Sequence, residues 1–293
     1  MPPIYKKALV LGATSGIGEA LAAKLVSEGT KVVVVGRRQA NLDAFVQKHG
    51  KGGGDSGSTE ATATVTAARF DVTDLDAIKP FAASITAQHP DLDCVVVNSG
   101  VQRAFDFARP EEGVDLAQVA LELNTNYTSA VYLTTAFLPH LASVSGGGHL
   151  VFVSATLGLV PSLIRTPNYN ASKAALHAFI MAVRQQLKEA NQAGGGGGGG
   201  SGVRIVEVFP PAVQTELHDA KHQPDLVDGG EIGMPLDVYT EKMYEGLVRG
   251  DEQFAVGPGE ALLREGGWED QRRKLFQEQN VAIQGMLSKY LKK

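Results

Sequence analysis

The sequence predicts an α/β fold in which helices cover both faces of a doubly wound parallel sheet. Three observations predict it. Six short, mostly β-branched apolar runs recur between residues 7 and 210 of the 293-residue chain, without the polar alternation of a half-exposed strand. The stretches between these runs carry apolar residues at helical spacing. Finally, a glycine-rich turn directly follows the first run. Strands that alternate with helices in this way form parallel sheets with right-handed crossovers.

The elements follow in a regular order. In the first helix, apolar residues recur at Ile17, Leu21 and Leu25, and Gly29 closes it. A second helical pattern begins near Tyr169, after the fifth apolar run. The predicted strands are residues 7–12, 31–36, 63–72, 93–100, 148–155 and 203–210.

The whole chain, residues 1–293, is expected to form a single domain. Its core spans about residues 5–216, and residues 217–293 supply a substrate lid and a helical extension. Residues 217–235 are rich in glycine and proline, as a mobile lid would be, whereas 237–250 and 267–293 have helical patterns. Two low-complexity stretches, 51–60 and 194–202, bury too little apolar surface to order and are expected to be mobile surface loops.

Composition excludes several classes of protein. The formal net charge of −5 disfavours nucleic acid or an anionic membrane as a partner, and no apolar run approaches the roughly 20 residues that span a bilayer. The N-terminal MPPIYKK lacks the apolar core of a signal peptide. The one cysteine, Cys94, begins a buried apolar run and cannot form an internal disulfide. We therefore expect a cytoplasmic protein.

The glycine-rich turn GATSGIG runs from Gly12 to Gly18 and opens a helix. Glycines permit a tight turn and close approach of the backbone, and a helix N-terminus presents free N–H groups to a pyrophosphate. Because the turn lies directly after the first strand, it predicts a dinucleotide-binding site. The cofactor-binding residues predicted here are Gly12, Thr14, Ser15, Gly16, Ile17 and Gly18.

This G-x-x-x-G-x-G spacing resembles the turn of the short-chain dehydrogenase/reductases, which have a Rossmann-like fold. In that family Thr usually precedes the first glycine, whereas this chain has Leu11. The second strand then ends at Gly36-Arg37-Arg38, with no acid between Val32 and Asn41. A carboxylate there would bind a ribose 2′-hydroxyl, whereas guanidinium groups bind a 2′-phosphate. NADP(H) is therefore the expected cofactor, with Arg37 and Arg38 as its phosphate partners.

A tyrosine and a lysine share one helix face in the sequence YNASK. Tyr169 and Lys173 are four residues apart, one helical turn. A phenol with a pKa near 10 is a poor acid–base group at neutral pH, and a nearby ammonium favours its ionised form. Such a pair could make Tyr169 a proton donor to a carbonyl oxygen.

The resemblance covers roughly residues 5–216 and implies further roles. Tyr169 would be the acid–base of a hydride-transfer enzyme, and Lys173 would tune it and hold the nicotinamide ribose. Asn126 would anchor a proton-relay water. In P-P-A-V-Q-T, Pro211 replaces the usual glycine of the segment that covers the nicotinamide. The other cofactor-binding residues that the resemblance implies are Asp71, Val72, Asn98, Gly100, Pro210, Val213 and Thr215.

The family's fifth strand commonly ends in Ser-Ser, and the second hydroxyl binds the substrate oxygen. Aligned on the strand and on Gly158, that position is Ala155, between Ser154 and Thr156. Counting the family's usual thirteen residues back from Tyr169 reaches Thr156 instead. Three interpretations stay open: Ser154 supplies the hydroxyl, Thr156 supplies it, or nothing does. Ser154 is the provisional assignment.

We therefore expect an NADP(H)-dependent oxidoreductase that interconverts a carbonyl and an alcohol and requires no metal. The alternative is a cyclase or isomerase that keeps NADP as a structural or recycled cofactor. A third interpretation is a non-catalytic NADP-binding protein. The resemblance implies a homodimer or homotetramer. An apolar or aromatic substrate is predicted from six candidate pocket residues: Phe105, Phe107, Leu157, Leu159, Val160 and Leu163.

Overall fold

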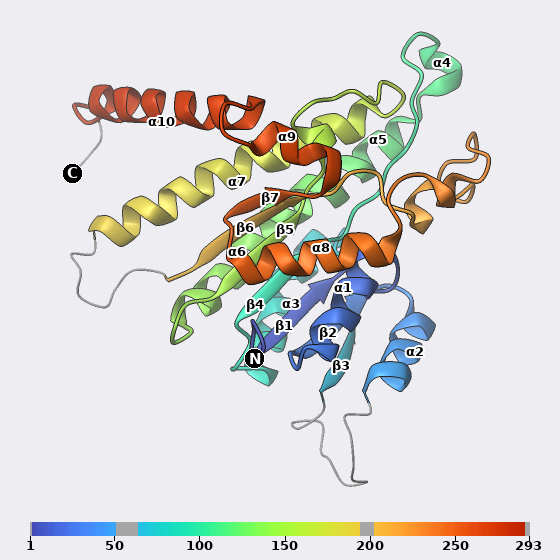
Figure 1. Cartoon of the computed structure of the whole chain (residues 1–293), viewed down its shortest axis with the longest axis horizontal. Helices are drawn as coiled ribbons and strands as arrows, with labels where there is room; N and C mark the ends of the chain where they lie inside the picture. The colour runs from blue at the N-terminus through green and yellow to red at the C-terminus, as the bar shows by residue number, and fades with distance from the viewer. Residues whose placement is uncertain (1, 51–63, 194–201, 291–293) are drawn as a thin grey trace, which may run out of the picture.

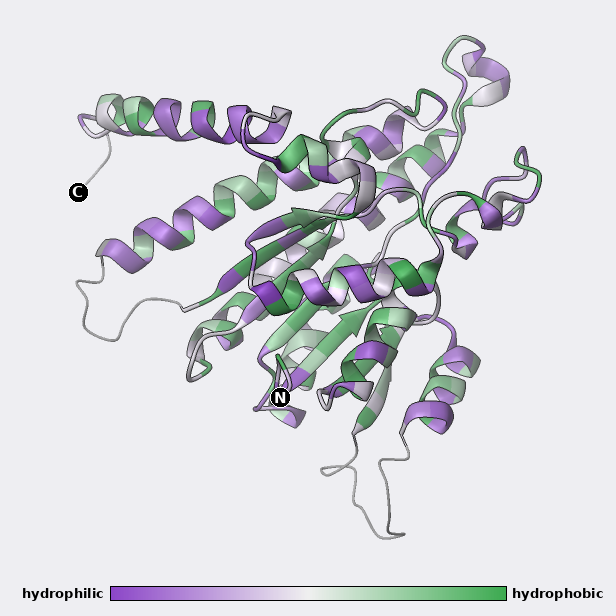
Figure 2. Cartoon of the chain, viewed as in Figure 1, coloured by the Kyte–Doolittle hydropathy of each residue, from purple (hydrophilic) through white to green (hydrophobic). Residues whose placement is uncertain are grey.

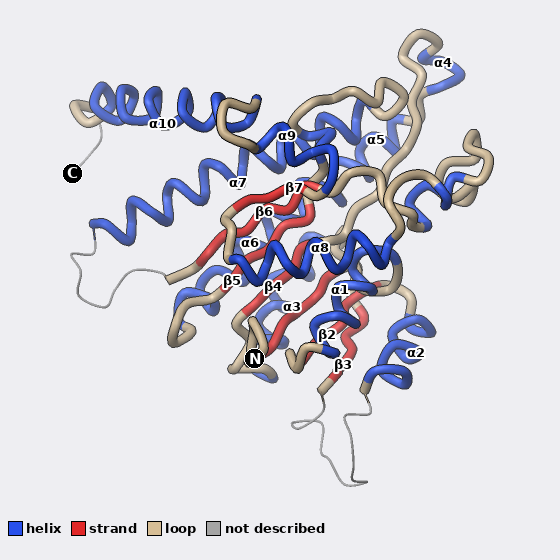
Figure 3. Tube along the Cα trace, viewed as in Figure 1, coloured by secondary structure: helices blue, strands red, loops and turns tan. Residues whose placement is uncertain are grey.

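A computed structural model describes residues 2–50, 64–193 and 202–290, and within them seven parallel strands form one sheet. The strand order is β3-β2-β1-β4-β5-β6-β7, and helices lie on both faces of the sheet (Figure 3). The doubly wound fold predicted from the sequence is confirmed. The strands are β1 (Lys7–Leu11), β2 (Lys31–Gly36), β3 (Val65–Arg69), β4 (Cys94–Val97), β5 (His149–Val153), β6 (Arg204–Phe209) and β7 (Gln253–Ala255).

The strand order reverses at β1, which pairs with β2 on one side and with β4 on the other. In this arrangement the connections after β1 and β4 leave in opposite directions, so a crevice opens beyond their carboxyl ends. Every residue of β1 and β4 is buried, which is why both read as unbroken apolar runs.

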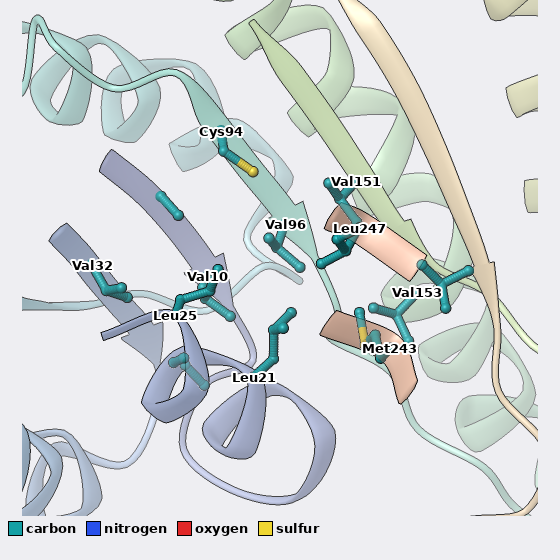
Figure 4. Close-up of a cluster of buried hydrophobic side chains, with 14 of the residues drawn as sticks. Val10, Leu21, Leu25, Val32, Cys94, Val96, Val151, Val153, Met243 and Leu247 are labelled. Atoms are coloured by element: carbon teal, nitrogen blue, oxygen red, sulfur yellow. The ribbon is translucent and has the colours of Figure 1, made fainter. Parts of the chain in front are cut away.

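Two helical layers cover the sheet (Figure 1). On one face, α1 and α8 pack together, and Leu21, Leu25, Met243 and Leu247 meet the valines of the sheet (Figure 4). On the other face, α3, α6 and α7 form a second apolar core. The helices are α1 (Gly16–Ser27), α2 (Gln39–His49), α3 (Leu75–Gln88), α4 (Pro110–Gly113), α5 (Leu116–Leu123), α6 (Ser129–Ser143), α7 (Pro167–Ala193), α8 (Leu236–Arg249), α9 (Glu260–Leu263) and α10 (Trp268–Leu287).

Hydropathy follows these layers. The strands are largely hydrophobic, whereas the helices mix hydrophilic and hydrophobic residues (Figure 2). In the described part of the chain, no helix combines the length and apolar character that crossing a bilayer requires.

The prediction of six strands was incomplete. The seventh, β7, is a three-residue edge strand that pairs with β6 through Glu207, Val208 and Phe209. So short a run leaves no periodic signal, and only its neighbour strand makes it regular. The predicted loops 51–60 and 194–202 lie outside the described residues, except for residue 202.

The helical extension is anchored by a buried ionisable cluster. His177 of α7 lies between Glu207 of β6, 2.7 Å from Nδ1, and Glu269 of α10, 3.1 Å from Nε2. All three side chains are fully buried. Because it is fully buried between these carboxylates, His177 serves as a packed residue of the helix. The first turn of α10 is therefore tied to the sheet, while the rest of α10 extends beyond the layered core (Figure 1).

Candidate active site

A cavity of about 680 Å³ lies beyond the carboxyl ends of the strands, in the expected crevice. It collects nearly every residue predicted for the site. Two predicted residues, Gly18 and Asn126, lie behind its wall. Those that line it are Gly12, Thr14, Ser15, Gly16, Ile17, Arg37, Arg38, Asp71, Val72, Asn98, Gly100, Ser154, Tyr169, Lys173, Pro210, Val213 and Thr215.

The glycine turn has the shape that a dinucleotide requires. Gly12 has a φ of +77°, in the left-handed region where a side chain would be strained. A Cβ at Gly18 would lie 2.3 Å from the Gly12 carbonyl oxygen, so the helix can approach the strand only with glycine there. Since α1 begins at Gly16, its first N–H groups lie at the cavity wall, where an anion can bind. The turn therefore fits a pyrophosphate.

The arginine corner, formed by Arg37 and Arg38 after β2, also contains an acid from a distant part of the sequence, Glu216. Arg38 donates from Nη1 to Glu216 at 3.0 Å, and its Nη2 lies 2.8 Å from the other oxygen of that carboxylate. Arg38 also donates to Thr14 Oγ1 at 3.1 Å, and the Ser15 hydroxyl donates to Glu216. Burial alone would raise the pKa of Glu216, but the hydrogen bonds from Arg38 and Ser15, together with the charge of Arg38, lower it below its usual value. An anionic ligand at this corner would have to share or replace Glu216.

Arg37, the second predicted phosphate partner, is more open. Its side chain is 63% exposed, and its guanidinium lies 3.8 Å from Asp71. Asp71 in turn accepts hydrogen bonds from the backbone N–H and the hydroxyl of Thr73. The two arginines thus lie at one end of the cavity, and Arg37 has donors available to a ligand.

The turn after β4 is held from both sides. Asn98 donates to the Gly12 carbonyl at 3.1 Å and so links this turn to the glycine turn. Asn126, in a π-helical turn between α5 and α6, accepts from the Val101 N–H at 2.8 Å and donates to Ser172 at 3.0 Å. It therefore ties the β4 turn to α7, and it contacts the site through its neighbours.

Helix α7 places Tyr169 and Lys173 side by side at the cavity. The Lys173 ammonium lies 5.8 Å from the centre of the Tyr169 ring and donates to the Val153 carbonyl at 2.9 Å. Burial raises the pKa of Tyr169 well above its usual range, and the charge of Glu122 raises it further. Burial lowers the pKa of Lys173 to about 8.

The expectation that lysine favours an ionised phenol is therefore wrong for this state of the chain. Loss of hydration favours the neutral phenol, because Tyr169 is almost fully buried, and the charge of Glu122 acts in the same direction. At neutral pH Tyr169 is a protonated phenol beside an ammonium group. That pair is suited to donating a proton.

Glu122 of α5 was not identified from the sequence. Its side chain is fully buried, it accepts a hydrogen bond from Asn168 at 3.2 Å, and its second oxygen has no partner among the described residues. Burial raises the pKa of Glu122 to about 7. The missed signal was its position four residues before Asn126, in a short helix whose other residues are apolar except for Gln118.

The three residues after β5 differ in what their side chains do. Ser154 is 2% exposed, and its hydroxyl has no hydrogen-bond partner among the described residues. The Thr156 hydroxyl lies 3.3 Å from the Pro210 carbonyl, to which it donates. Ala155, buried between them, offers no donor. Of the two candidate hydroxyls, only that of Ser154 is unengaged.

The segment after β6 covers the cavity. Thr215 caps a short 3₁₀ turn, Glu216–His218, and accepts from the Leu217 N–H. Farther along, Gln223 is 1% exposed and donates to the Gln102 side chain at 2.9 Å, while its own oxygen accepts from Arg165. This lid is thus fastened to the β4 loop, and whether it moves stays a prediction.

The six predicted apolar pocket residues divide into three groups. Leu157 and Leu163 line the cavity. Phe105 and Leu159 are buried elsewhere, and Phe107 and Val160 are exposed. Placing all six at the pocket was wrong because the loops after β4 and β5 turn those side chains into the core or toward solvent. His218, at the end of the 3₁₀ turn, lies with its Nδ1 3.3 Å from the Gln223 side-chain nitrogen.

Comparison with known proteins points to one family. The family described as "short chain dehydrogenase" matches residues 6–225. An uncharacterized oxidoreductase from Myxococcus xanthus is 32% identical over 86% of this chain and 87% of its own length. An NADP-dependent 3-hydroxy acid dehydrogenase from Salmonella typhi is 28% identical over 76% of this chain and 79% of its own.

Solved structures agree on the fold. A short-chain dehydrogenase from Sphingobium yanoikuyae, in complex with NADPH, superposes with a TM-score of 0.72 at 21% identity and covers 92% of this chain and 95% of its own. An alcohol dehydrogenase from Thermococcus sibiricus, complexed with 5-hydroxy-NADP, gives a TM-score of 0.67 at 19% identity over 86% and 96%.

Proposed function

The chain belongs to the short-chain dehydrogenases, oxidoreductases that use nicotinamide cofactors, and from this premise we propose that it reduces a ketone or aldehyde with NADPH, or catalyses the reverse reaction. The observation that carries the proposal is the pair of Tyr169 and Lys173 at the wall of a cavity that also holds a dinucleotide-shaped glycine turn. Among the described residues that line the cavity, no other pair combines a buried acid with an adjacent cation.

The choice of NADP(H) rests on the arginine corner. Arg37 and Arg38 would hold the 2′-phosphate, and the N–H groups at Gly16 and Ile17 would hold the pyrophosphate. Relatives and structural neighbours that carry NADP in their names support this choice. When bound, the nicotinamide supplies or accepts the hydride.

Tyr169 would donate its phenolic proton to the substrate oxygen as the alcohol forms. Its raised pKa keeps that proton in place until a carbonyl oxygen begins to take up negative charge. The Lys173 ammonium, held by the Val153 carbonyl, would stabilise the phenolate that remains after transfer.

Two further residues would prepare the site. The free hydroxyl of Ser154 would donate a second hydrogen bond to the substrate oxygen. Asn126 would keep the loop after β4 in register with α7 through Val101 and Ser172, so that Gly100 stays beside Lys173.

The test is NADPH consumption with a panel of ketones, aldehydes and quinones, followed by analysis of the products. Wild-type protein should oxidise NADPH in step with alcohol formation. Tyr169→Phe should lose at least about 10³-fold in kcat/KM, because the proton donor is gone while the ring that packs the cavity remains.

The same variant should bind NADPH with unchanged affinity, measured by fluorescence titration. If the protein reduces no compound of the panel, the reductase proposal is wrong. Product formed at constant NADPH would instead favour a cyclase or isomerase.

A further inference from the structure

The end of the cavity beyond Tyr169 carries cations that form no ion pair within the described part of the chain. Arg103, from the loop after β4, lines it together with Lys221 and His222 of the lid. Among the described residues neither Arg103 nor Lys221 forms an ion pair, and the one hydrogen bond of the Arg103 guanidinium, 2.8 Å long, goes to the carbonyl of its own neighbour Gln102. A half-buried guanidinium of this kind has donors to spare.

Arg103, Lys221 and His222 lie close enough for their charges to interact. Burial lowers the pKa of His222, and the positive charges of Arg103 and Lys221 lower it further, whereas the carboxylates of Glu216 and Asp219 oppose that shift. Cations that repel one another are gathered at one cavity wall by two separate segments, the β4 loop and the lid. Such a cluster lowers its electrostatic energy when an anion binds.

The nearby acids are bound to other groups or lie off the cavity wall. Glu216 is bound to Arg38 and Ser15, although its charge also raises the pKa of His222. Glu122 lies behind the wall, bonded to Asn168, and Asp219 does not line the cavity. Asp71, the other acid on the cavity wall, lies beside Arg37. The charge of Arg103 lowers the pKa of Glu122, but no carboxylate of the described residues forms an ion pair with the Arg103 guanidinium.

Apolar side chains complete this end. Leu157 and Leu163, from the segment between β5 and α7, and Leu217, from the lid, line the cavity together with Arg103. A ligand that fits would present a hydrocarbon portion to the leucines and an anionic group to the cations.

We propose that the substrate is a carbonyl compound bearing an anionic group, a carboxylate or a phosphate, which Arg103 binds while Tyr169 faces the carbonyl. The proposal rests on the reductase function above and names its substrate class. A guanidinium suits this role because its planar donors match carboxylate and phosphate oxygens.

The test compares matched probes. The probes are 4-oxo-4-phenylbutanoate, its neutral methyl ester and phenacyl phosphate, and the readout is kcat/KM with NADPH. Wild-type protein should prefer an anionic probe over the ester by about 10- to 100-fold, as expected for a charge-assisted hydrogen bond. Which anion is preferred distinguishes carboxylate from phosphate.

Arg103→Met should remove that preference. Arg109→Met is the matched control, because Arg109 lies on the same loop but is exposed and paired with Asp106, so the preference should persist. Lys221→Met, at an exposed position that a substitution should not unfold, should reduce the preference by a smaller factor. Equal wild-type rates for acid and ester would overturn the proposal.

A binding measurement separates this proposal from the reductase function. Equilibrium dialysis of the acid and the ester against NADP⁺-loaded protein should give tighter binding of the acid in wild type and equal binding in Arg103→Met. If acid binding depends on Arg103 but no probe turns over, the reductase function fails and the anion site stands. If Arg103→Met instead weakens NADP⁺ itself and leaves the ratio of acid to ester intact, Arg103 serves the cofactor and the proposal is wrong.

Discussion

The two ends of the cavity differ in whether their polar and charged side chains already have partners. At the arginine corner the chain satisfies its own charges, since Arg38 is bound to Glu216 and Thr14, and Arg37 lies near Asp71. At the end that holds Tyr169, the Ser154 hydroxyl, one Glu122 oxygen and the Arg103 guanidinium lack such partners within the described residues. A ligand must exchange partners at the first end, whereas it supplies missing partners at the second.

This difference bears on where specificity and catalysis reside. Unpaired buried polar groups cost free energy unless a ligand satisfies them, so a fold that keeps them gives up stability for chemistry. The arginine corner, whose charges already have partners, gains less binding free energy from a ligand, but it stays ordered without one. The variants below test the contrast, beginning with the largest expected effect.

Ser154→Ala should lower kcat/KM by about 10²- to 10³-fold, the loss typical of removing one donor to a developing oxyanion. Thr156→Val is the control and should change the rate little, because the Thr156 hydroxyl donates to the Pro210 carbonyl instead. Steady-state kinetics on the best substrate of the panel decides. Unchanged turnover in Ser154→Ala, with a gain in Ala155→Ser, would put the required hydroxyl at position 155.

Glu122→Gln should change how stability depends on pH. Because the pKa of Glu122 is higher in the folded chain, the stabilisation that its protonated form provides is complete below pH 4.5 and is lost as pH rises through about 7. One pKa unit corresponds to about 1.4 kcal/mol. Over that pH range, the free energy of unfolding of the wild-type chain should therefore fall by about 3 kcal/mol relative to that of Glu122→Gln.

Urea unfolding at pH 5 and pH 8 measures this difference. Glu112→Gln, at an exposed position of α4, should show no such pH dependence. If the difference in free energy of unfolding between wild type and Glu122→Gln is the same at both pH values, Glu122 is ionised in the folded chain at both.

The reduction rate should fall at alkaline pH. Burial lowers the pKa of Lys173 to about 8, so the ammonium that stabilises the phenolate is lost as pH rises through that value. The profile of kcat/KM for the free enzyme should then decline by up to about tenfold per pH unit above 8. Lys173→Arg, if active, should keep its charge and move the decline to higher pH. An identical decline in both proteins would assign it to another group.

Glu216→Gln should tighten NADPH binding by about two- to fivefold, the size expected for a half-exposed ion pair. The substitution frees Arg38 and removes a negative charge near the expected phosphate. Fluorescence titration gives the Kd, and Glu241→Gln on α8, which breaks an ion pair with Lys24 of α1, is the control. Weaker NADPH binding in Glu216→Gln would show that the carboxylate shapes the corner rather than competing there.

Sequence alone determined the sheet, the glycine turn and the pair of Tyr169 and Lys173. Each of these depends on local order: unbroken apolar runs, glycines between a strand and a helix, and four-residue spacing on one helix. Such features depend on residues that are close together in the sequence, so the sequence is enough to predict them.

Tertiary structure decided which charges meet. Glu216 reaches Arg38 across 178 positions of sequence, and Arg103 meets a lid more than a hundred residues away. Burial, which only the assembled layers create, set the protonation of Tyr169, Lys173 and Glu122. Electrostatic energies depend on distance and hydration in space, and the order of residues along a chain specifies neither.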